Sequence, residues 1–278
     1  MTQPGVPQVV KHYELVRQIG EGGMSLVFLA HDRRDGSEVV VKLLHALFGD
    51  DETYRERFER EAHVAALLRS PFTVHLLDFG QADGRYFLVT ELVHGMTLRE
   101  ALRNGPMEPK RALRVAAQIA RALEEAQARG VVHRDIKPAN VMLTATDGVK
   151  VLDFGVARQE GSLTLTVPGS FVGTANYASP EAAAGETDIR SDIYSLGATL
   201  YHMLAGYPPF SGDFIQLLRQ HREATVNMAP LEGLPREAVE IVRRCLAKDP
   251  ADRYQSASQL AGALEHAAAA VSMRSAAA

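Results

Sequence analysis

The stretch VVHRDIKPANVML, from Val131 to Leu143, places a polar cluster between two apolar runs. Apolar flanks of this kind predict short strands, or a helix end and a strand, that hold the polar loop from both sides. Loops fixed in this way are common places for catalytic groups, although Asp, Lys, Pro and Asn are also ordinary turn residues. The remainder of the chain has to distinguish a catalytic loop from a solvated turn.

The composition is that of a soluble globular protein, with 278 residues of which 46% are hydrophobic and 23% charged. The net charge of −4 gives no sign of a nucleic-acid surface, and Cys245, the single cysteine, indicates a reducing compartment. We find no signal-peptide pattern and no apolar run long enough to span a bilayer. Both ends have the composition of linkers, so we expect a cytoplasmic protein or the cytoplasmic domain of a longer, membrane-anchored one.

The first third of the chain predicts strands with one helix among them. The helix covers about 54–69, where Phe58, Ala62, Ala65 and Leu68 recur at helical spacing, and it ends before Ser70-Pro71 because the residue before proline disfavours helix. The predicted strands are 13–19, 26–30, 39–44, 74–80 and 85–92.

After Gly95 the pattern changes to helices. They are predicted at 109–130, 191–205, 214–223, 236–248 and from 258 onward, with a hairpin that turns at Asp147-Gly148. The layout predicts an α+β fold with two lobes, a small antiparallel-sheet lobe with one key helix and a larger, mainly helical lobe. We assign 1–10 to a flexible tail, 11–93 to the small lobe, 94–268 to the large lobe and 269–278 to a low-complexity tail.

Three glycines and a lysine suggest a site for phosphate. Gly20, Gly22 and Gly23 lie between two predicted strands, and a loop without side chains lets backbone N–H groups approach phosphate oxygens, although such glycines usually make only a hairpin. Lys42 lies inside an apolar strand, where a lysine snorkels to solvent unless it meets a phosphate or a carboxylate. Glu61 on the following helix could supply that carboxylate.

Asn140 and Asp153 offer hard oxygen ligands of the kind that Mg²⁺ prefers together with substrate phosphates. Asp153 belongs to the tripeptide Asp-Phe-Gly, which follows a predicted strand. The same tripeptide also occurs at Asp78–Gly80, where we interpret it as a turn, so the tripeptide alone proves little.

The order of these motifs resembles the eukaryotic-type (Hanks-type) protein kinases from about Tyr13 to Ala263. The glycine-rich loop, VVVK with Lys42, Glu61, HRDIKPAN and DFG match that family in order, as do GTANYASPE (Gly173–Glu181), DIYSLG (Asp192–Gly197) and KDPADR (Lys248–Arg253). GGMS and GTANYASPE are most similar to the bacterial receptor-type serine/threonine kinases. The family pattern differs at Ser25, where a third glycine is usual, at Ser179, where an alanine is usual, and at Tyr194, where a tryptophan is usual.

The resemblance implies a role in phosphoryl transfer for each polar residue. Lys42, aligned by Glu61, would hold the α- and β-phosphates of ATP, and Asn140 and Asp153 would bind Mg²⁺, for which Mn²⁺ could substitute. Asp135 would accept the proton of the attacking hydroxyl while Lys137 steadies the γ-phosphate. His133 is expected to pack under Phe154 as a support.

The resemblance also implies the nucleotide pocket. Glu91 C=O and Val93 N–H would bind adenine, with Thr90 as gatekeeper. The remaining pocket residues would be Val27, Val40 and Met142 around the ring and Gly20, Gly22, Gly23 and Ser25 over the phosphates. Lys137 and the substrate-binding Thr174 favour Ser/Thr acceptors over Tyr.

The family pattern further implies activation by phosphorylation. The expected acceptors are Thr164, Thr166 and Ser170, modified in trans through a transient kinase dimer, with Arg57, Arg134 and Arg158 binding the phosphate. Glu181 and Arg253 are expected to form a buried ion pair that fixes the end of this segment.

The predicted function is therefore a serine/threonine protein kinase that acts on protein substrates. One alternative is a pseudokinase, which usually lacks an equivalent of Lys42, Asp135 or Asp153. Another is a small-molecule phosphotransferase, which generally lacks a segment such as GTANYASPE.

Overall fold

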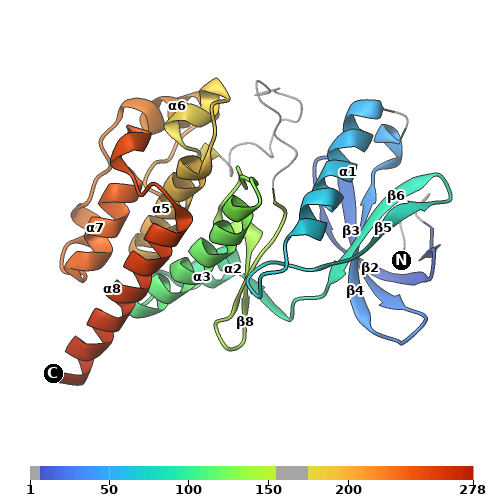
Figure 1. The fold of residues 1–278 in the computed structure, drawn as a ribbon, viewed down its shortest axis with the longest axis horizontal. Helices are drawn as coiled ribbons and strands as arrows, with labels where there is room; N and C mark the ends of the chain where they lie inside the picture. Colours follow the sequence, from blue (N-terminus) through green and yellow to red (C-terminus); the bar gives the residue numbers. More distant parts are fainter. Residues whose placement is uncertain (1–6, 50, 155–174, 278) are drawn as a thin grey trace. The chain divides into compact units, whose positions relative to one another are not determined.

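The computed structural model describes residues 7–49, 51–154 and 175–277. The chain divides into two compact units, one made of residues through Arg69 together with Val74–His94, the other of Ser70–Thr73 together with the residues from Gly95 onward. The first unit carries a sheet and helix α1, and the second is mainly helical (Figure 1). The predicted α+β fold is confirmed: the first unit is an antiparallel sheet with one long helix, and the second unit is mainly helical.

The first unit is built on an antiparallel sheet with the strand order β1-β2-β3-β4-β6-β5. Alternate residues of β3 and β4, among them Phe28, Ala30, Val41 and Leu43, are buried on one face and form a core with residues of β2 and β6. The strands are β1 (Val9–Val10), β2 (Tyr13–Glu21), β3 (Ser25–Asp32), β4 (Glu38–Leu44), β5 (Leu76–Ala82) and β6 (Arg85–Glu91).

Helix α1 (Glu52–Leu67) lies against β5 and β6 in this unit (Figure 1). It begins at Asp51, whose side chain accepts from the N–H of Thr53, a normal N-cap. Phe58 and Ala62 bury the apolar stripe of the helix against Leu44 and Leu88. The sheet and this stripe together fix the orientation of Glu61.

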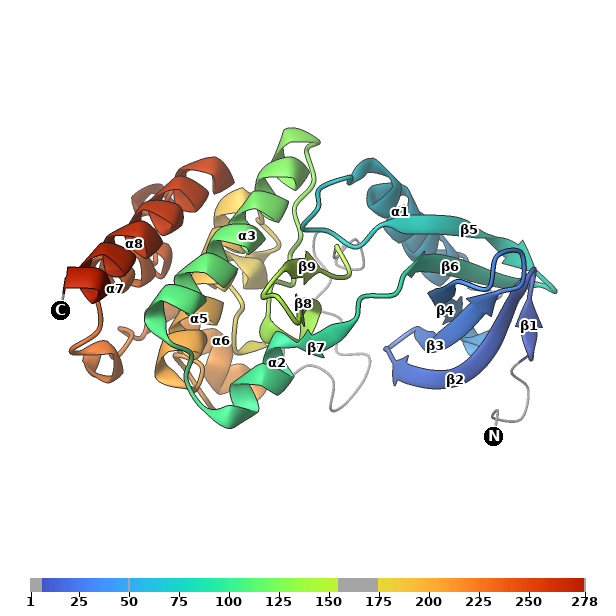
Figure 2. The ribbon, with the colours of Figure 1, turned by 90° about the horizontal axis from the view of Figure 1, so that it is seen from below.

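The second unit is organised around helix α5 (Ile189–Ala205), whose residues are buried from Ser191 to Tyr201. A Cβ on Gly197 would overlap that of Cys245, so this glycine permits the close packing of α5 against α7. The other α-helices in the described part of this unit are α2 (Leu98–Ala101), α3 (Pro109–Ala128), α6 (Phe214–Glu223), α7 (Arg236–Cys245) and α8 (Ala257–Ala277). Helices α3 and α8 lie side by side (Figure 2), and Arg121 of α3 makes a bidentate ion pair with Glu265 of α8.

The second unit also has a small sheet, with β7 (Gly95–Thr97), β8 (Val141–Thr144) and β9 (Val149–Val151) in the order β7-β8-β9. Strand β8 begins directly after the catalytic-loop motif HRDIKPAN (His133–Asn140). The predicted hairpin is confirmed, because β8 and β9 pair across a turn in which Asp147 has φ +59°. Gly95 has no room for a side chain, since a Cβ would overlap the carbonyl of Leu143.

The helices and strands differ from the prediction mainly at their ends and in short elements. β1, β7 and α2 were not predicted, because elements of two to four residues carry no periodic signal. The interpretation of Asp78–Gly80 as a turn is wrong, because these residues lie within strand β5 and pair with β6. Val10, assigned to a tail, is buried in β1, which pairs with β2. Residues 269–277, also assigned to a tail, continue helix α8, as the high helix propensity of alanine favours.

The structure groups residues 70–73 with the second unit, although the sequence analysis assigned them to the small lobe. Main-chain bonds explain this grouping. The N–H of Val151 donates to the carbonyl of Phe72 at 2.8 Å, and the N–H of Ser70 donates to the side chain of Glu125.

Candidate active site

The glycine-rich loop is the turn between β2 and β3. The N–H of Gly22 donates to the carbonyl of Ser25 at 2.7 Å, which closes the turn, and Ser25 is buried. A Cβ on Gly23 would meet nothing within 4 Å, and one on Gly20 would make only ordinary contact with Val27. The fold of this unit thus does not need glycine at these two positions, and the bare backbone remains open to an approaching phosphate.

Lys42 and Glu61 form an ion pair in the first unit, with 2.6 Å between Nζ and Oε1. Lys42 is in the middle of β4, between Val27 of β3 and Leu88 of β6, and its side chain is 15% exposed. Only an opposite charge of this kind makes a nearly buried lysine tolerable. The pairing suggested by the sequence is present, and it fixes the ammonium group.

The residues expected around adenine are divided between the units. Thr90 and Glu91 end β6, where Thr90 pairs with Val40, and the Glu91 side chain accepts from the N–H of His75 at 3.0 Å. Val27, Val40 and Val93 are half-buried residues of the first unit, whereas Met142 belongs to β8 of the second.

The second unit gathers the polar residues of the catalytic-loop motif around Asp135. Its Oδ2 accepts from Lys137 Nζ at 2.7 Å and from Asn140 Nδ2 at 2.9 Å. Asn140 Nδ2 also donates to the main-chain carbonyl of Asp135. The Asp135 carboxylate is 23% exposed, so it is held in place and remains accessible.

His133 stabilises this loop through hydrogen bonds between both of its ring nitrogens and main-chain groups. Its Nδ1 accepts from the N–H of Asp135 at 3.2 Å, so Nε2 carries the proton and donates to the carbonyl of Leu152 at 2.9 Å. The imidazole is fully buried and lies 4.6 Å from the ring of Phe154, centroid to centroid. The predicted packing of His133 with Phe154 is confirmed.

Asp192 also contacts this loop, although the sequence alone assigned it no role. Its two carboxylate oxygens accept from the N–H groups of His133 and Arg134, both at 2.7 Å. Burial raises the pKa of Asp192, while the two N–H donors favour its ionised form. The carboxylate therefore anchors the backbone just before Asp135; the only sequence signal was its place in the motif DIYSLG.

Backbone strain is concentrated at two positions of this site. Arg134 has φ +65° and Asp153 has φ +44°, in a region that non-glycine residues rarely adopt. Asp83 and Asp147 also have positive φ, but they occupy hairpin turns that require it. Strain held by the surroundings outside such turns is typical of functional sites.

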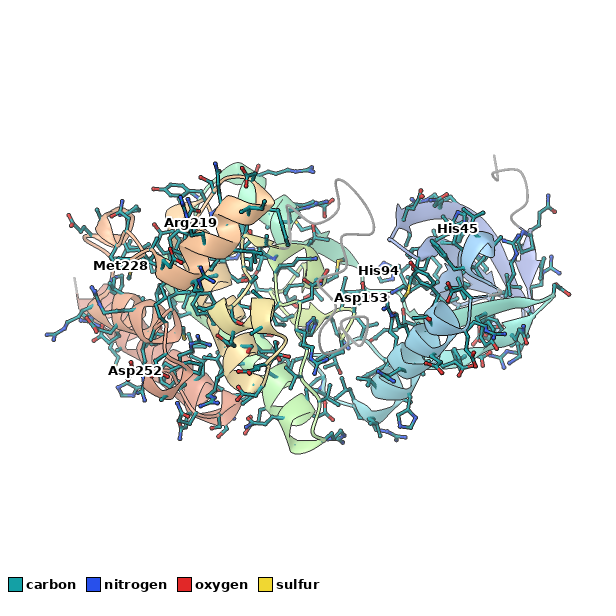
Figure 3. The ribbon with its side chains drawn as sticks, turned by 90° about the horizontal axis from the view of Figure 1, so that it is seen from above. His45, His94, Asp153, Arg219, Met228 and Asp252 are labelled. Carbon is teal, nitrogen blue, oxygen red and sulfur yellow. The ribbon has the colours of Figure 1, made fainter. Side chains whose placement is uncertain are left out.

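The side-chain oxygens of Asn140 and Asp153 are suitable ligands for a divalent cation. Asp153 is an exposed carboxylate two residues after β9 (labelled in Figure 3), and the N–H of Leu152 donates to the carbonyl of Asn140 at 2.9 Å. With its Nδ2 directed to Asp135, the Asn140 amide has its oxygen left as an acceptor. Within the described ranges no cluster of three or more His, Cys, Asp or Glu could hold a metal.

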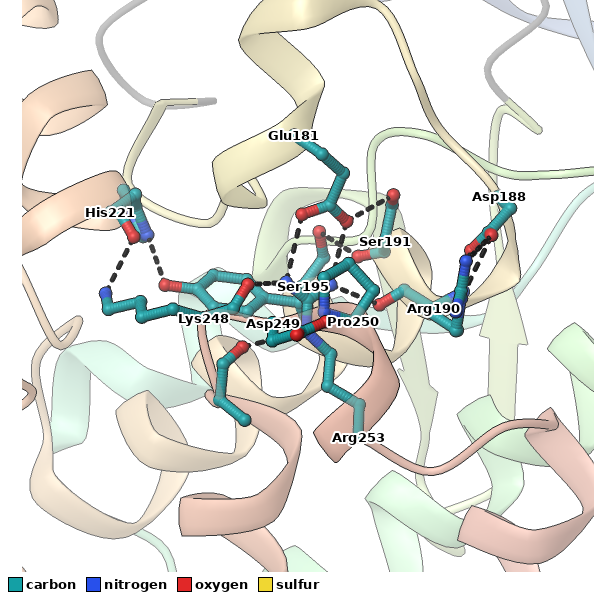
Figure 4. A network of polar contacts seen from close by, with 12 residues as sticks. Glu181, Asp188, Arg190, Ser191, Ser195, His221, Lys248, Asp249, Pro250 and Arg253 are labelled. Atoms are coloured by element: carbon teal, nitrogen blue, oxygen red, sulfur yellow. Dashed lines mark hydrogen bonds and ion pairs between the residues drawn. The ribbon is translucent and has the colours of Figure 1, made fainter.

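The predicted ion pair between Glu181 and Arg253 is confirmed (Figure 4). Arg253 is completely buried, and its two terminal nitrogens donate to the two oxygens of Glu181 at 2.7 and 2.9 Å. Burial alone would raise the pKa of Glu181, but the hydrogen bonds from Arg253 and Ser191 lower it below its ordinary value. The pair ties residue 181 to the loop before α8.

Several expected residues lie outside the described residues, namely Arg158, Thr164, Thr166, Ser170 and Thr174. Arg57, expected to bind a phosphate, is described. It lies one turn before Glu61 on α1, with its guanidinium 5.6 Å from the ring centroid of Tyr54.

Known proteins are similar to nearly the whole chain. The model of the family "Protein kinase domain" matches residues 13–266. Serine/threonine-protein kinase PknB of Mycobacterium tuberculosis is 43% identical over 271 residues, which cover 94% of this chain and 43% of that protein. The probable serine/threonine-protein kinase PknB of Bifidobacterium longum is 40% identical over 263 residues, covering 89% of this chain and 38% of that protein.

Solved structures are similar as well. The PknI kinase domain of Mycobacterium tuberculosis matches with a TM-score of 0.73 and 28% identity, covering 96% of this chain and 100% of that one.

The chain thus spans less than half the length of these curated relatives. In the part of the chain that the structure describes, none of the helices combines the length and the apolar character needed to cross a bilayer.

Proposed function

The chain belongs to the protein kinase domain family, and on this premise we propose that it transfers the γ-phosphate of ATP to serine and threonine hydroxyls of proteins. The observation that carries the proposal is the triad around Asp135, whose Oδ2 is held by both Lys137 and Asn140. Lys137, two residues after Asp135, together with the relatives that are serine/threonine kinases, supports Ser/Thr acceptors.

Asp135 acts as the base in this proposal. Its carboxylate orients the acceptor hydroxyl and takes up the proton as the oxygen attacks phosphorus. Lys137, already 2.7 Å from that carboxylate, supplies a positive charge beside the transferring phosphoryl group. His133 takes no proton, because both of its ring nitrogens are already engaged with main-chain groups.

Lys42 holds the phosphates that are not transferred. The ion pair with Glu61 keeps the ammonium extended from β4, so binding of the nucleotide needs little reorganisation. The backbone of Gly20, Gly22 and Gly23, of which the last two are exposed, contributes N–H donors to the same phosphates. This preorganisation is the contribution of the first unit.

Family membership implies ATP and a divalent metal, and we propose Mg²⁺, held by Asn140 and Asp153. A bound Mg²⁺ supplies positive charge to the phosphate oxygens. The Asn140 amide also orients the Asp135 carboxylate, because its Nδ2 donates to Oδ2 of Asp135. No described feature favours the pseudokinase alternative.

We further propose that phosphorylation in trans at Thr164, Thr166 or Ser170, through a transient dimer, raises activity. Arg57, Arg134 and Arg158 would bind the phosphate. Mass spectrometry after incubation with MgATP should find the modification, and replacement of all three acceptors by alanine should lower the activity. Unchanged activity of the triple variant would refute this switch.

The central test is transfer of radioactive γ-phosphate from ATP to a generic protein substrate. Asp135→Asn and Lys42→Met should each leave a folded protein whose turnover falls by at least about 100-fold, the usual scale for a positioned base or charge clamp. Asp147→Asn is the matched control, since Asp147 is also an ion-paired aspartate but lies on the β8–β9 turn with Arg111. Turnover near that of the parent in a folded Asp135→Asn variant would refute the assignment.

A further inference from the structure

Two tyrosine–histidine pairs lie at residues 175–177 of the second unit or against them. Tyr177 lies in the segment itself, with its hydroxyl 2.7 Å from Nδ1 of His202 on α5. In the other pair the hydroxyl of Tyr194, also on α5, lies 2.9 Å from Nδ1 of His221 on α6. Ala175 packs with Phe210 and Leu217, so the segment rests directly on α6 and the loop before it.

The Tyr194–His221 pair occupies a position where the family pattern has a tryptophan. A buried phenol needs a hydrogen-bond partner, and His221 supplies it. The ring of Phe210 packs against the imidazole with 4.9 Å between centroids, and Lys248 Nζ donates to the main-chain carbonyl of His221 at 2.6 Å. Tyr194 is fully buried and His221 is 1% exposed.

The second ring nitrogen of His221 is directed to the segment. Nε2 is buried and makes no hydrogen bond to any residue that the structure describes. Burial, and then the charge of Lys248, lowers the pKa of His221 to about 4, while the carbonyls of Asn176 and Ala175 oppose this change because they lie near the ring. With the Tyr194 hydroxyl as the donor to Nδ1, the proton of the neutral ring is on Nε2, and the carbonyls of Asn176 and Ala175 lie near the ring.

We propose that Tyr194 and His221 are positioning residues for the acceptor peptide. Tyr194 orients the imidazole, and the Nε2–H of His221 closes onto a carbonyl of Ala175 or Asn176 when a peptide occupies the segment. A buried donor without an acceptor is unfavourable, so a small movement that makes this bond is favoured. The inference rests on the proposed function, with the acceptor peptide taken to bind beside residues 175–177.

The test is Tyr194→Phe, which removes a single hydroxyl. Tyr201→Phe is the matched control, because Tyr201 is a buried tyrosine of the same helix whose hydroxyl donates to the carbonyl of Asn227 at 2.8 Å. Steady-state kinetics would vary myelin basic protein and ATP separately. Tyr194→Phe should raise the KM for myelin basic protein by about 3- to 10-fold, the scale of one hydrogen bond, with kcat and the KM for ATP nearly constant.

Two substitutions of His221 provide an independent measurement. His221→Gln retains an N–H donor near the position of Nε2 and should keep the KM for myelin basic protein near that of the parent, whereas His221→Leu should raise it. Adding Tyr194→Phe to His221→Leu should cause no further increase, because the two residues act as one unit.

The outcomes separate this inference from the proposed function. Equal effects of Tyr194→Phe and Tyr201→Phe on the KM, or equal effects of His221→Gln and His221→Leu, would show a merely structural role and overturn the inference. If Tyr194→Phe does not fold, the two His221 variants decide. A parent chain that phosphorylates neither itself nor myelin basic protein would refute the proposed function, and the inference with it.

Discussion

Arg253 offers a sharp test of how a buried charge stabilises the second unit. Its guanidinium has five N–H donors, and the structure provides five acceptors. Two are the oxygens of Glu181, and three are the main-chain carbonyls of Ala247, Arg190 and Lys248. The side chain is fully buried, so all five bonds are made away from solvent.

The expected losses follow from this count. Arg253→Ala leaves the carboxylate of Glu181, which is 15% exposed, without its cation, and should lower the free energy of unfolding by about 3–5 kcal/mol. Arg253→Lys keeps the charge, but an ammonium has only three donors, so at least two acceptors lose their bonds. At about 1 kcal/mol for each lost bond, the cost should be about 2 kcal/mol.

Urea denaturation measures both values, and Arg111→Ala is the control. Arg111 makes the same bidentate contact, with Asp147, but the side chains are 45% and 38% exposed. Its loss should cost no more than about 1 kcal/mol. If Arg253→Lys is as stable as the parent, or if Arg253→Ala costs no more than Arg111→Ala, burial is not what gives this pair its importance.

Three further predictions use other features. Gly197→Ala should destabilise the protein because its Cβ would overlap that of Cys245, whereas Gly262→Ala, where a Cβ meets nothing within 4 Å in α8, should stabilise it by about 0.5–1 kcal/mol; denaturation that ranks them otherwise contradicts the packing. Burial lowers the pKa of His221 to about 4, so between about pH 6.5 and 4 the unfolded chain binds more protons. Stability should therefore fall by up to about 3 kcal/mol as the pH decreases through this window, and His221→Gln should reduce that fall; identical pH profiles of unfolding would argue against a neutral, buried imidazole. EDTA should abolish phosphate transfer and weaken ATP binding in calorimetry, and equal activity without metal would refute the role of Asn140 and Asp153.

Local patterns predicted much of the fold and part of the site. Helical spacing placed Phe58 and Ala62 on the buried stripe of α1, and Glu61 next to them followed as the partner of Lys42. The hairpin at Asp147 was also predictable, because the pair Asp-Gly favours hairpin turns, whose central residues have positive φ.

Other features depend on contacts between distant residues and left no local signal. Asp192 reaches the N–H of His133 across 59 positions of sequence, and Glu125 holds Ser70 across 55. Neither carboxylate belongs to a pattern that names its partner. The positive φ of Arg134 was also unpredictable, since arginine has no preference for that conformation and tertiary contacts impose it.

Residues 191–194 of α5 make several of these contacts between distant parts of the sequence. Asp192 holds the backbone before Asp135, the proposed base, and Ser191 donates to Glu181. Tyr194, two residues further on, orients the imidazole on α6. Because residues 191–194 carry all three contacts and are buried on every face, they link the position of Asp135, the proposed base, to that of Glu181 within the second unit. A rigid helix positions functional groups more accurately than separate loops could. For this reason α5 is buried even at its polar residues Ser191 and Asp192.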